Sequence, residues 1–364
     1  MNYPVIEGLV QPGWHGALPS LDFTLPPDLE AGLPPEARGL HRDQVRLMVS
    51  YRHNLNITHS RFDRLADFLR PGDVLVINTS KTLKAALNIK RADGMDLELH
   101  LSTHLSSHRW VVEARQAAGE GTAPFYSLRA GEKLRLPGGG EAVILSPYPE
   151  TMPRQRLWTA SLTLPHPVER YLETYGFPIR YKYVHEGWPV EYYQNVYANE
   201  PGSAEMPSAG RAFSLDLITS LVARGILFAP LVLHTGVASL ENDEPPYEEY
   251  FRVPEATAQL VNSIHAANGR VIAVGTTVVR ALQTVSDPDG SVHAGEGWTD
   301  LVITPYTYLA SIDGLLTGFH EPRSSHLSML LAVAGKELIT KAYQEALENG
   351  YLWHEFGDVQ LILP

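Results

Sequence analysis

The stretch RVIAVGTTVVRALQT, residues 270–284, decides the fold class. Its first apolar run is short and continuous, as in a buried strand, and it ends at Gly275. Thr276 and Thr277 follow, and then an apolar-periodic run that contains Arg280 predicts a helix. A buried strand that leads directly into a helix is the building unit of a layered α/β domain.

The same junction also predicts a chemical site. We expect Thr276 or Thr277 to be the N-cap of the helix, with Arg280 one turn later. The free backbone N–H groups and the positive end of the helix dipole attract a carboxylate or a phosphate. The alternative is a helix cap with no ligand, which most strand–Gly–Thr–helix junctions are.

The regions around this stretch predict two domains. Helices and strands alternate in LDLITSLVARG (residues 215–225), ILFAPLVLHTG (226–236) and EATAQLVNSIHAANG (255–269). Between residues 71 and 164 the pattern is a series of short strands separated by turns, which predicts a small antiparallel barrel. We therefore predict an α/β main domain, residues 1–65 and 165–364, with an inserted antiparallel β-barrel domain, residues 66–164.

Composition excludes several classes of protein. The chain has 364 residues, of which 44% are hydrophobic and 19% charged, so it can form large cores. It has no cysteine, which excludes disulfides, thiolate metal sites and cysteine nucleophiles. It lacks an apolar run of about 18 residues, and its first residues, MNYPVIEGLVQPGW, do not resemble a signal peptide. We expect a cytoplasmic monomer with no membrane association.

Charge limits the possible partners. The net charge of −12 rules out a global basic field for nucleic acid. A local strip from Arg61 to Arg91 carries seven basic residues and three acidic ones, which could contact nucleic acid or could simply be a solvated face.

Individual polar residues stand at positions where α/β sheets bind ligands. His234 follows a buried strand, and His320 lies at a second strand-to-helix corner. Glu248 and Glu249 lie between tyrosines, where an aromatic pocket would raise the pKa of a carboxyl group that acts as a base. Asp358 precedes the last strand as a turn residue or as a ligand for a hydroxyl. Core histidines and solvated acidic pairs are the alternatives.

A metal site is not expected. His100, His104 and His108 are spaced by four residues, but they lie in a segment that reads as a hairpin, so they do not share a helix face. The chain also lacks a phosphate loop, a dinucleotide fingerprint and a zinc-protease motif.

Several long blocks, in colinear order over nearly the whole chain, resemble the S-adenosylmethionine:tRNA ribosyltransferase-isomerase family of the queuosine pathway. These blocks are LDFTLPPDL, RDQVRLMV, RFDRLADFLRPGDVLVINTSKT, YYQNVYANEPGSAEMPSAGRAFS, GILFAPLVLHTGV, RVIAVGTTVVRALQT, TGFHEPRSSHLSMLLAVAG and YLWHEFGDVQLIL. The resemblance implies an α/β domain with an inserted barrel. It also implies that S-adenosylmethionine is a co-substrate whose ribosyl part is transferred to 7-aminomethyl-7-deazaguanine in tRNA, with release of adenine and methionine.

Such a reaction needs a base, an acid near the adenine and an anchor for the methionine carboxylate. The resemblance therefore assigns expected roles to the residues above. Proton transfer falls to His234 and Glu249, with His320 in the same catalytic group; S-adenosylmethionine binding falls to Gly275, Thr276, Thr277, Arg280 and Asp358; acceptor binding falls to Asn78, Lys81, Ser208 and Arg211.

The chain departs from the family pattern at positions expected to line the site. Ser80 stands in the NTSKT loop, Arg211 and Ala212 replace a leucine and a histidine, and Tyr247–Glu249 replace a His-Ser-Glu run. Three readings follow: the family reaction on tRNA, a paralogue that uses S-adenosylmethionine with a different and possibly small acceptor, and a binding protein without catalysis.

Overall fold

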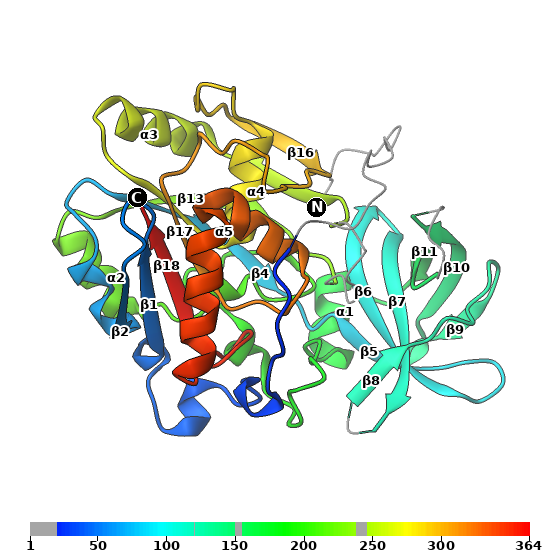
Figure 1. The fold of residues 1–364 in the computed structure, drawn as a ribbon. Coiled ribbons are helices and arrows are strands. Elements are labelled where there is room, and N and C mark those ends of the chain that lie inside the picture. The colour runs from blue at the N-terminus through cyan, green and yellow to red at the C-terminus, as the bar shows by residue number, and fades with distance from the viewer. Residues whose placement is uncertain (1–19, 120, 150–154, 238–245) are drawn as a thin grey trace.

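The computed structural model describes residues 20–364, apart from residue 120, residues 150–154 and residues 238–245. The N-terminal sequence used in the localisation prediction lies outside these residues. Two bodies are visible, a main α/β domain and a smaller barrel beside it (Figure 1). Within the described ranges, no helix is long and apolar enough to cross a membrane.

A nine-stranded mixed sheet forms the centre of the main domain. Four strands at its middle, β13, β3, β15 and β17, run parallel to one another. The strands follow one another across the sheet in the order β16 (Gly295–Thr299), β14 (Glu249–Val253), β13 (Leu227–Leu233), β3 (Val74–Asn78), β15 (Val271–Val274), β17 (Gly314–Gly318), β18 (Val359–Leu363), β1 (Arg46–Tyr51) and β2 (Ile57–Arg61).

Both faces of this sheet are covered, which is why its central strands read as continuous apolar runs. Val74 and Val76 of β3 pack in the core that includes α3 (Glu255–Ala266), α4 (Thr276–Thr284) and α5 (Ser325–Glu348). Leu75 and Ile77 point to the other core, with η4 (Phe62–Asp67) and α2 (Leu215–Ala223). Figure 1 shows α5 crossing in front of the sheet and α2 at its side.

The second body is a closed antiparallel barrel, which confirms the predicted fold class. Around it run β5 (Ala86–Lys90), β6 (Asp96–Ser106), β7 (Arg109–Ala118), β11 (Leu157–Thr163), β10 (Glu141–Tyr148) and β9 (Lys133–Arg135), and β9 pairs back to β5. A separate apolar core fills it, to which α1 (Val168–Tyr175) contributes Tyr171 and Leu172. β8 (Gly121–Pro124) extends β7 outside the ring.

The predicted N-terminal boundary of the barrel, at residue 66, is too early. β3 lies between β13 and β15 in the large sheet, and η4 packs under that sheet. A run of four apolar residues looks the same from sequence in a barrel strand and in a parallel-sheet strand, so the pattern could not separate the two. We propose residues 86–163 as the barrel domain.

A parallel two-stranded ribbon, β4 (Ser80–Thr82) with β12 (Glu200–Ser203), connects the two bodies. The remaining elements are short 3-10 helices: η1 (Pro27–Leu29), η2 (Pro35–Arg38), η3 (Arg42–Gln44), η5 (Pro137–Gly139), η6 (Val190–Tyr193) and η7 (Ser208–Gly210).

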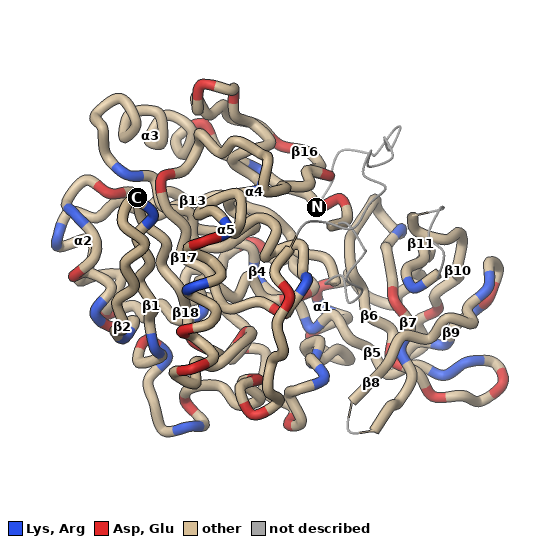
Figure 2. Tube along the Cα trace, viewed as in Figure 1, with Lys and Arg blue, Asp and Glu red and all other residues tan. Residues whose placement is uncertain are grey.

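The predicted basic strip does not form a single surface. Its members divide between the two domains, and Figure 2 shows basic and acidic positions mixed over both. Most of them face a carboxylate: Arg61 pairs with Asp63, Arg64 with Asp67, Lys84 with Glu173, Lys90 with Asp96, and Arg91 with Asp93 and Glu132. The sequence alone did not show these ion pairs, because some of the acidic partners lie on other elements and not only at neighbouring positions.

Candidate functional site

The polar residues predicted from sequence gather at one edge of the nine-stranded sheet. Asn78 ends β3, His234 follows β13 and Gly275 follows β15. His320 follows β17, and the antiparallel pairing of Gly318 with Val359 brings Asp358 to the same edge. β13 and β15 flank β3 on opposite sides, so this edge holds a topological switch point, where open α/β sheets bind their ligands.

The barrel contributes to this edge as well. In β6, the Ser102 hydroxyl accepts a hydrogen bond from the Val237 N–H at 2.9 Å. Gly236 approaches the same strand closely, because a Cβ there would lie 2.9 Å from Ser102 Oγ and 3.1 Å from Thr103 Oγ1. The candidate site therefore lies where the two domains meet.

Asn78 links the ends of two strands. Its Nδ2 donates to the Leu233 carbonyl at 2.8 Å and to Thr277 Oγ1 at 3.3 Å, and its Oδ1 accepts the Leu233 N–H at 3.0 Å and the Ser80 N–H at 3.1 Å. These bonds occupy the whole amide. Through them Asn78 fixes the end of the strand that leads to His234, while its role in acceptor binding stays a prediction.

His234 is buried beside two hydroxyl groups. Its Nδ1 lies 2.7 Å from Ser80 Oγ, which in turn lies 2.5 Å from Ser203 Oγ. Its ring stacks on Tyr250, with 5.7 Å between centroids. Burial, followed by the charge of Arg252, lowers the pKa of His234 to about 4. The imidazole is therefore neutral at pH 7 and has a lone pair to accept a proton.

The low pKa of His234 can be tested directly. We expect its imidazole signals, followed by ¹H–¹⁵N NMR, to titrate with a midpoint near pH 4. Because the folded-state pKa is depressed, the unfolded chain binds more protons between about pH 4 and 6.5, so this group lowers the free energy of unfolding as the pH falls through that window. His293 is the internal control, since its hydrogen bond to Asp287 raises its pKa above the usual value. A His234 midpoint above that of His293 would contradict the burial argument.

Gly202 in β12 makes room for the His234 ring. A Cβ at this position would lie 2.4 Å from Cε1 and 2.5 Å from Nδ1 of His234. We expect Gly202→Ala to push the imidazole away from Ser80 and to lower the free energy of unfolding by about 1–3 kcal/mol, the usual range for overpacking. Urea denaturation measures the loss.

Gly187→Ala is the matched control for this substitution, since a Cβ at Gly187 would meet nothing within 4 Å. A surface change of that kind shifts stability by no more than about 0.5 kcal/mol. Equal stability of the two variants would show that the ring yields without strain.

Glu249 and Arg280 form a buried ion pair beside this group. Glu249 also accepts the Gly236 N–H at 3.0 Å, and its burial raises the pKa of the carboxyl group against the opposing charge of Arg280. The other donors of Arg280 go to the carbonyls of Leu301, Thr299 and Tyr247, at 3.1, 3.1 and 3.2 Å. The guanidinium predicted to anchor a ligand is thus bound within the protein, where it fixes Glu249.

The turn between β15 and α4 is made by Gly275. Gly275, at φ 97°, is the N-cap of α4, not Thr276 or Thr277 as predicted. Its N–H donates to the Leu316 carbonyl at 2.8 Å, and its own carbonyl accepts the Val278 N–H at 3.2 Å. A side chain is unfavourable at this φ, which explains the glycine. Thr276 and Thr277 then form the first turn of α4, at the switch point.

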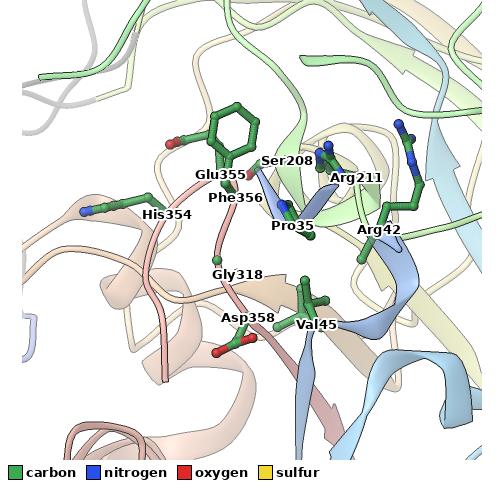
Figure 3. Close-up of a pocket in the computed structure, with 13 residues that line it drawn as sticks. Pro35, Arg42, Val45, Ser208, Arg211, Gly318, His354, Glu355, Phe356 and Asp358 are labelled. Atoms are coloured by element: carbon green, nitrogen blue, oxygen red, sulfur yellow. The ribbon is translucent and has the colours of Figure 1, made fainter. Parts of the chain in front are cut away.

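A second group of residues surrounds a cavity at the same sheet edge, drawn in Figure 3. Its volume is ≈ 10 Å³, which is about the room that one water molecule or one ligand oxygen needs. The lining residues are Pro35, Arg42, Val45, Ser208, Arg211, Ala212, Gly318, His354, Glu355, Phe356, Gly357, Asp358 and Val359. Two predicted substrate-binding residues, Ser208 and Arg211, thus meet Asp358, which was predicted for S-adenosylmethionine.

Asp358 joins two backbone segments, those of Arg46 and Leu352. Its Oδ1 accepts the Arg46 N–H at 2.7 Å, and its Oδ2 accepts the Leu352 N–H at 2.8 Å. Sequence reasoning missed Arg42, His354 and Glu355 in this cavity. His354 and Glu355 stand four and three residues before Asp358, within a block already quoted for the resemblance, so proximity to Asp358 was a usable signal.

His320 belongs to a histidine pair that the sequence did not indicate. Its Nε2 lies 2.9 Å from Thr317 Oγ1, and its ring stacks on His326 at 4.6 Å. Burial and the neighbouring His326 lower the pKa of His320 well below its usual value. Lys81, by contrast, is exposed on β4, next to the buried Ser80. Among the residues that the structure covers, no cluster of His, Asp and Glu could hold a metal ion.

These features define an α/β protein that carries an inserted barrel and presents its polar site where the domains meet. Residues 18–362 match the family model described as queuosine biosynthesis protein, and the chain belongs to that family. The resemblance seen in the sequence blocks is thereby confirmed.

Relatives match over nearly their full length. Proteins of Symbiobacterium thermophilum and Moorella thermoacetica, both named S-adenosylmethionine:tRNA ribosyltransferase-isomerase, are 36% and 37% identical to this chain. The matches cover 95% and 94% of this chain, and 99% and 98% of the relatives. A crystal structure of S-adenosylmethionine tRNA ribosyltransferase from Thermotoga maritima has a TM-score of 0.53 at 28% identity, over 94% of this chain and 99% of the other.

Proposed function

We propose that this protein transfers and isomerises the ribosyl part of S-adenosylmethionine onto 7-aminomethyl-7-deazaguanine in tRNA, forming epoxyqueuosine and releasing adenine and methionine. The near full-length match to relatives named for this activity supports the proposal. The observation that carries it in the structure is a buried, neutral histidine at the switch point, whose Nδ1 lies 2.7 Å from Ser80 Oγ.

The chemistry requires a base close to the sulfonium. A sulfonium acidifies the protons of the adjacent 5′ carbon, so a positioned base can form an ylide. Adenine then leaves, and the amine of the acceptor attacks the ribosyl fragment. His234 is our candidate for the base because its imidazole is unprotonated at neutral pH.

Glu249 is our second candidate for proton transfer, because burial raises the pKa of its carboxyl group above the usual value. The ion pair with Arg280 fixes the direction of the carboxylate. Gly275 sets the start of α4, and the backbone N–H groups of Thr276 and Thr277 in the first turn are our candidate donors for an anionic part of S-adenosylmethionine. These assignments rest on geometry and on the needs of the reaction.

A small acceptor is the second candidate. The absence of a basic strip among the described residues, together with the net charge of −12, favours an acceptor that does not depend on phosphate contacts. In that case S-adenosylmethionine would bind in the same place, and a free amine would replace the tRNA base.

A measurement of adenine release distinguishes a tRNA acceptor from a small acceptor. The full-length protein is incubated with S-adenosylmethionine and either tRNA that carries the aminomethyl precursor, the same tRNA with unmodified guanine, or free small amines, and products are identified by mass spectrometry. We expect adenine and a ribosylated nucleoside only with precursor tRNA. Adenine release that requires a free amine and ignores the tRNA would overturn the proposal.

A further inference from the structure

An unsatisfied arginine lies in the cavity of Figure 3. Arg211 is 2% exposed. Its Nε donates to the Tyr192 carbonyl at 3.1 Å and its Nη2 to Glu36 at 2.7 Å. Its Nη1 is also buried, and no residue in the described part of the chain accepts a hydrogen bond from it. A buried charged donor without an acceptor is unfavourable, so the site is incomplete in the absence of a ligand or water.

The surroundings of Arg211 are rich in positive charge. Arg42 lines the same cavity and shares Glu36 with Arg211, at 3.5 Å. Arg38 contributes a third guanidinium, which donates to the Phe356 carbonyl at 2.7 Å. Glu36 is thus the carboxylate that pairs with two of the three arginines.

The acidic residues that line the cavity offset only part of this charge, and in the described structure none of them accepts a hydrogen bond from Arg211 Nη1. The oxygens of Asp358 already accept backbone N–H groups of Arg46 and Leu352. Glu355 accepts the hydroxyl of Tyr183, and burial raises the pKa of its carboxyl group to about 7, so it is only partly ionised at neutral pH.

The cavity also adjoins the turn at the switch point. Ser208 and Ala209 belong to η7, and a Cβ on Gly275 would lie 3.3 Å from the Ala209 Cβ. A ligand at the first turn of α4 is therefore separated from Arg211 by one short helix. Because Arg280 is committed to Glu249, the nearby guanidinium nitrogens without a hydrogen-bond partner in the described structure are Arg211 Nη1 and Arg38 Nε, and of these two residues only Arg211 lines the cavity.

We propose that this cavity is an oxyanion subsite, in which Arg211 and Arg42 bind a carboxylate or phosphate oxygen of a substrate. The inference rests on the proposed function, which supplies two sources for such a group: the carboxylate of S-adenosylmethionine and a phosphate of the tRNA. Both would satisfy Arg211 Nη1 with a charge-assisted hydrogen bond.

Binding measurements on the full-length protein test the subsite. Calorimetry is run with S-adenosylmethionine, with decarboxylated S-adenosylmethionine and with precursor tRNA, for the wild type, Arg211→Leu and Arg211→Lys. We expect Arg211→Leu to weaken one of the two substrates by about 10-fold or more, the size of a lost charge-assisted hydrogen bond. Arg211→Lys retains the charge without the fork and should recover part of the affinity.

The arms of the experiment identify the source. If the carboxylate is the ligand, Arg211→Leu weakens S-adenosylmethionine and leaves its decarboxylated analogue unchanged. If a phosphate is the ligand, tRNA binding weakens and its salt slope falls by about 1. Arg224→Leu is the charge-matched control, because Arg224 is an exposed residue at the end of α2.

The subsite is overturned if folded Arg211→Leu protein loses less than about threefold in affinity for both substrates. Arg211 Nη1 would then be assigned to a structural water. If Arg211→Leu does not fold, the same affinities are measured for Arg211→Lys and Arg42→Gln and judged by the same criterion. Adenine release by the wild type is measured in parallel. Normal release with unchanged binding refutes the subsite alone, whereas absent release refutes the proposed function and leaves the binding data to decide the subsite.

Discussion

His234→Gln is expected to slow adenine release by about 10²–10⁴-fold, the usual contribution of a positioned acid or base. Glutamine retains a hydrogen-bonding group for Ser80 Oγ, which lies 2.7 Å from the histidine, but it cannot accept a proton. The substitution therefore removes the chemistry while it keeps most of the packing. Single-turnover release of adenine with saturating precursor tRNA measures the effect on the chemical step.

The control for this variant is His265→Gln. His265 lies in α3 and pairs with Asp313, whose carboxylate accepts the Val271 N–H at the amino end of β15, on the opposite edge of the sheet. We expect His265→Gln to retain its rate within about twofold, as for a change away from the site. Full turnover by His234→Gln would exclude His234 as the base and leave Glu249 as the candidate.

Arg280→Met is expected to lower the free energy of unfolding by about 3–5 kcal/mol, the cost of leaving one partner of a buried ion pair uncompensated. The side chains of Arg280 and Glu249 are only 7% and 15% exposed, so water cannot replace the lost charge. Three backbone carbonyls also lose their donor. Urea denaturation at constant m-value measures the change.

The double variant Arg280→Met with Glu249→Leu should recover much of this stability, because no charge then remains buried. Arg252→Met is the exposed counterpart, since Arg252 pairs with Glu200 at a site with 39% of its side chain exposed, and surface pairs contribute only about 0–1 kcal/mol. If Arg280→Met were as mild as Arg252→Met, the pair would not be the element that holds Glu249.

Periodicity was sufficient to predict the architecture. The strand-to-helix junction at Gly275 and the hairpins of the barrel are where the pattern placed them, because burial of one or two faces imposes the spacing of apolar residues. β3 was misplaced because four consecutive apolar residues fit a parallel sheet and a barrel equally well. The sheet to which a short buried strand belongs depends on partner strands far away in the chain. The local sequence of the strand does not identify those partners.

The sequence predicts where the candidate site residues lie in the fold, but not how they are connected. The positions of His234 and Gly275 follow from the rule that ligands bind at the carboxyl ends of parallel strands. The pairing of Arg280 with Glu249 does not follow from spacing, since a helix residue and a strand residue 31 positions apart meet only after packing. For the same reason the orphan donor of Arg211 could be found only from a complete account of its hydrogen bonds.

The location of β3 in the centre of the sheet has a consequence for biosynthesis. The hydrogen bond from Asn78 to Leu233 joins residues 155 positions apart, and the pairing of Asp73 with Arg270 spans 197. Ribosomes add about 5–20 residues per second, so β3 waits on the order of 10–30 s for its first partner strand. The barrel is completed in that interval from nearer contacts. The nascent chain thus carries an apolar, unpaired strand ahead of a finished domain, and this interval is when aggregation or chaperone binding competes with folding.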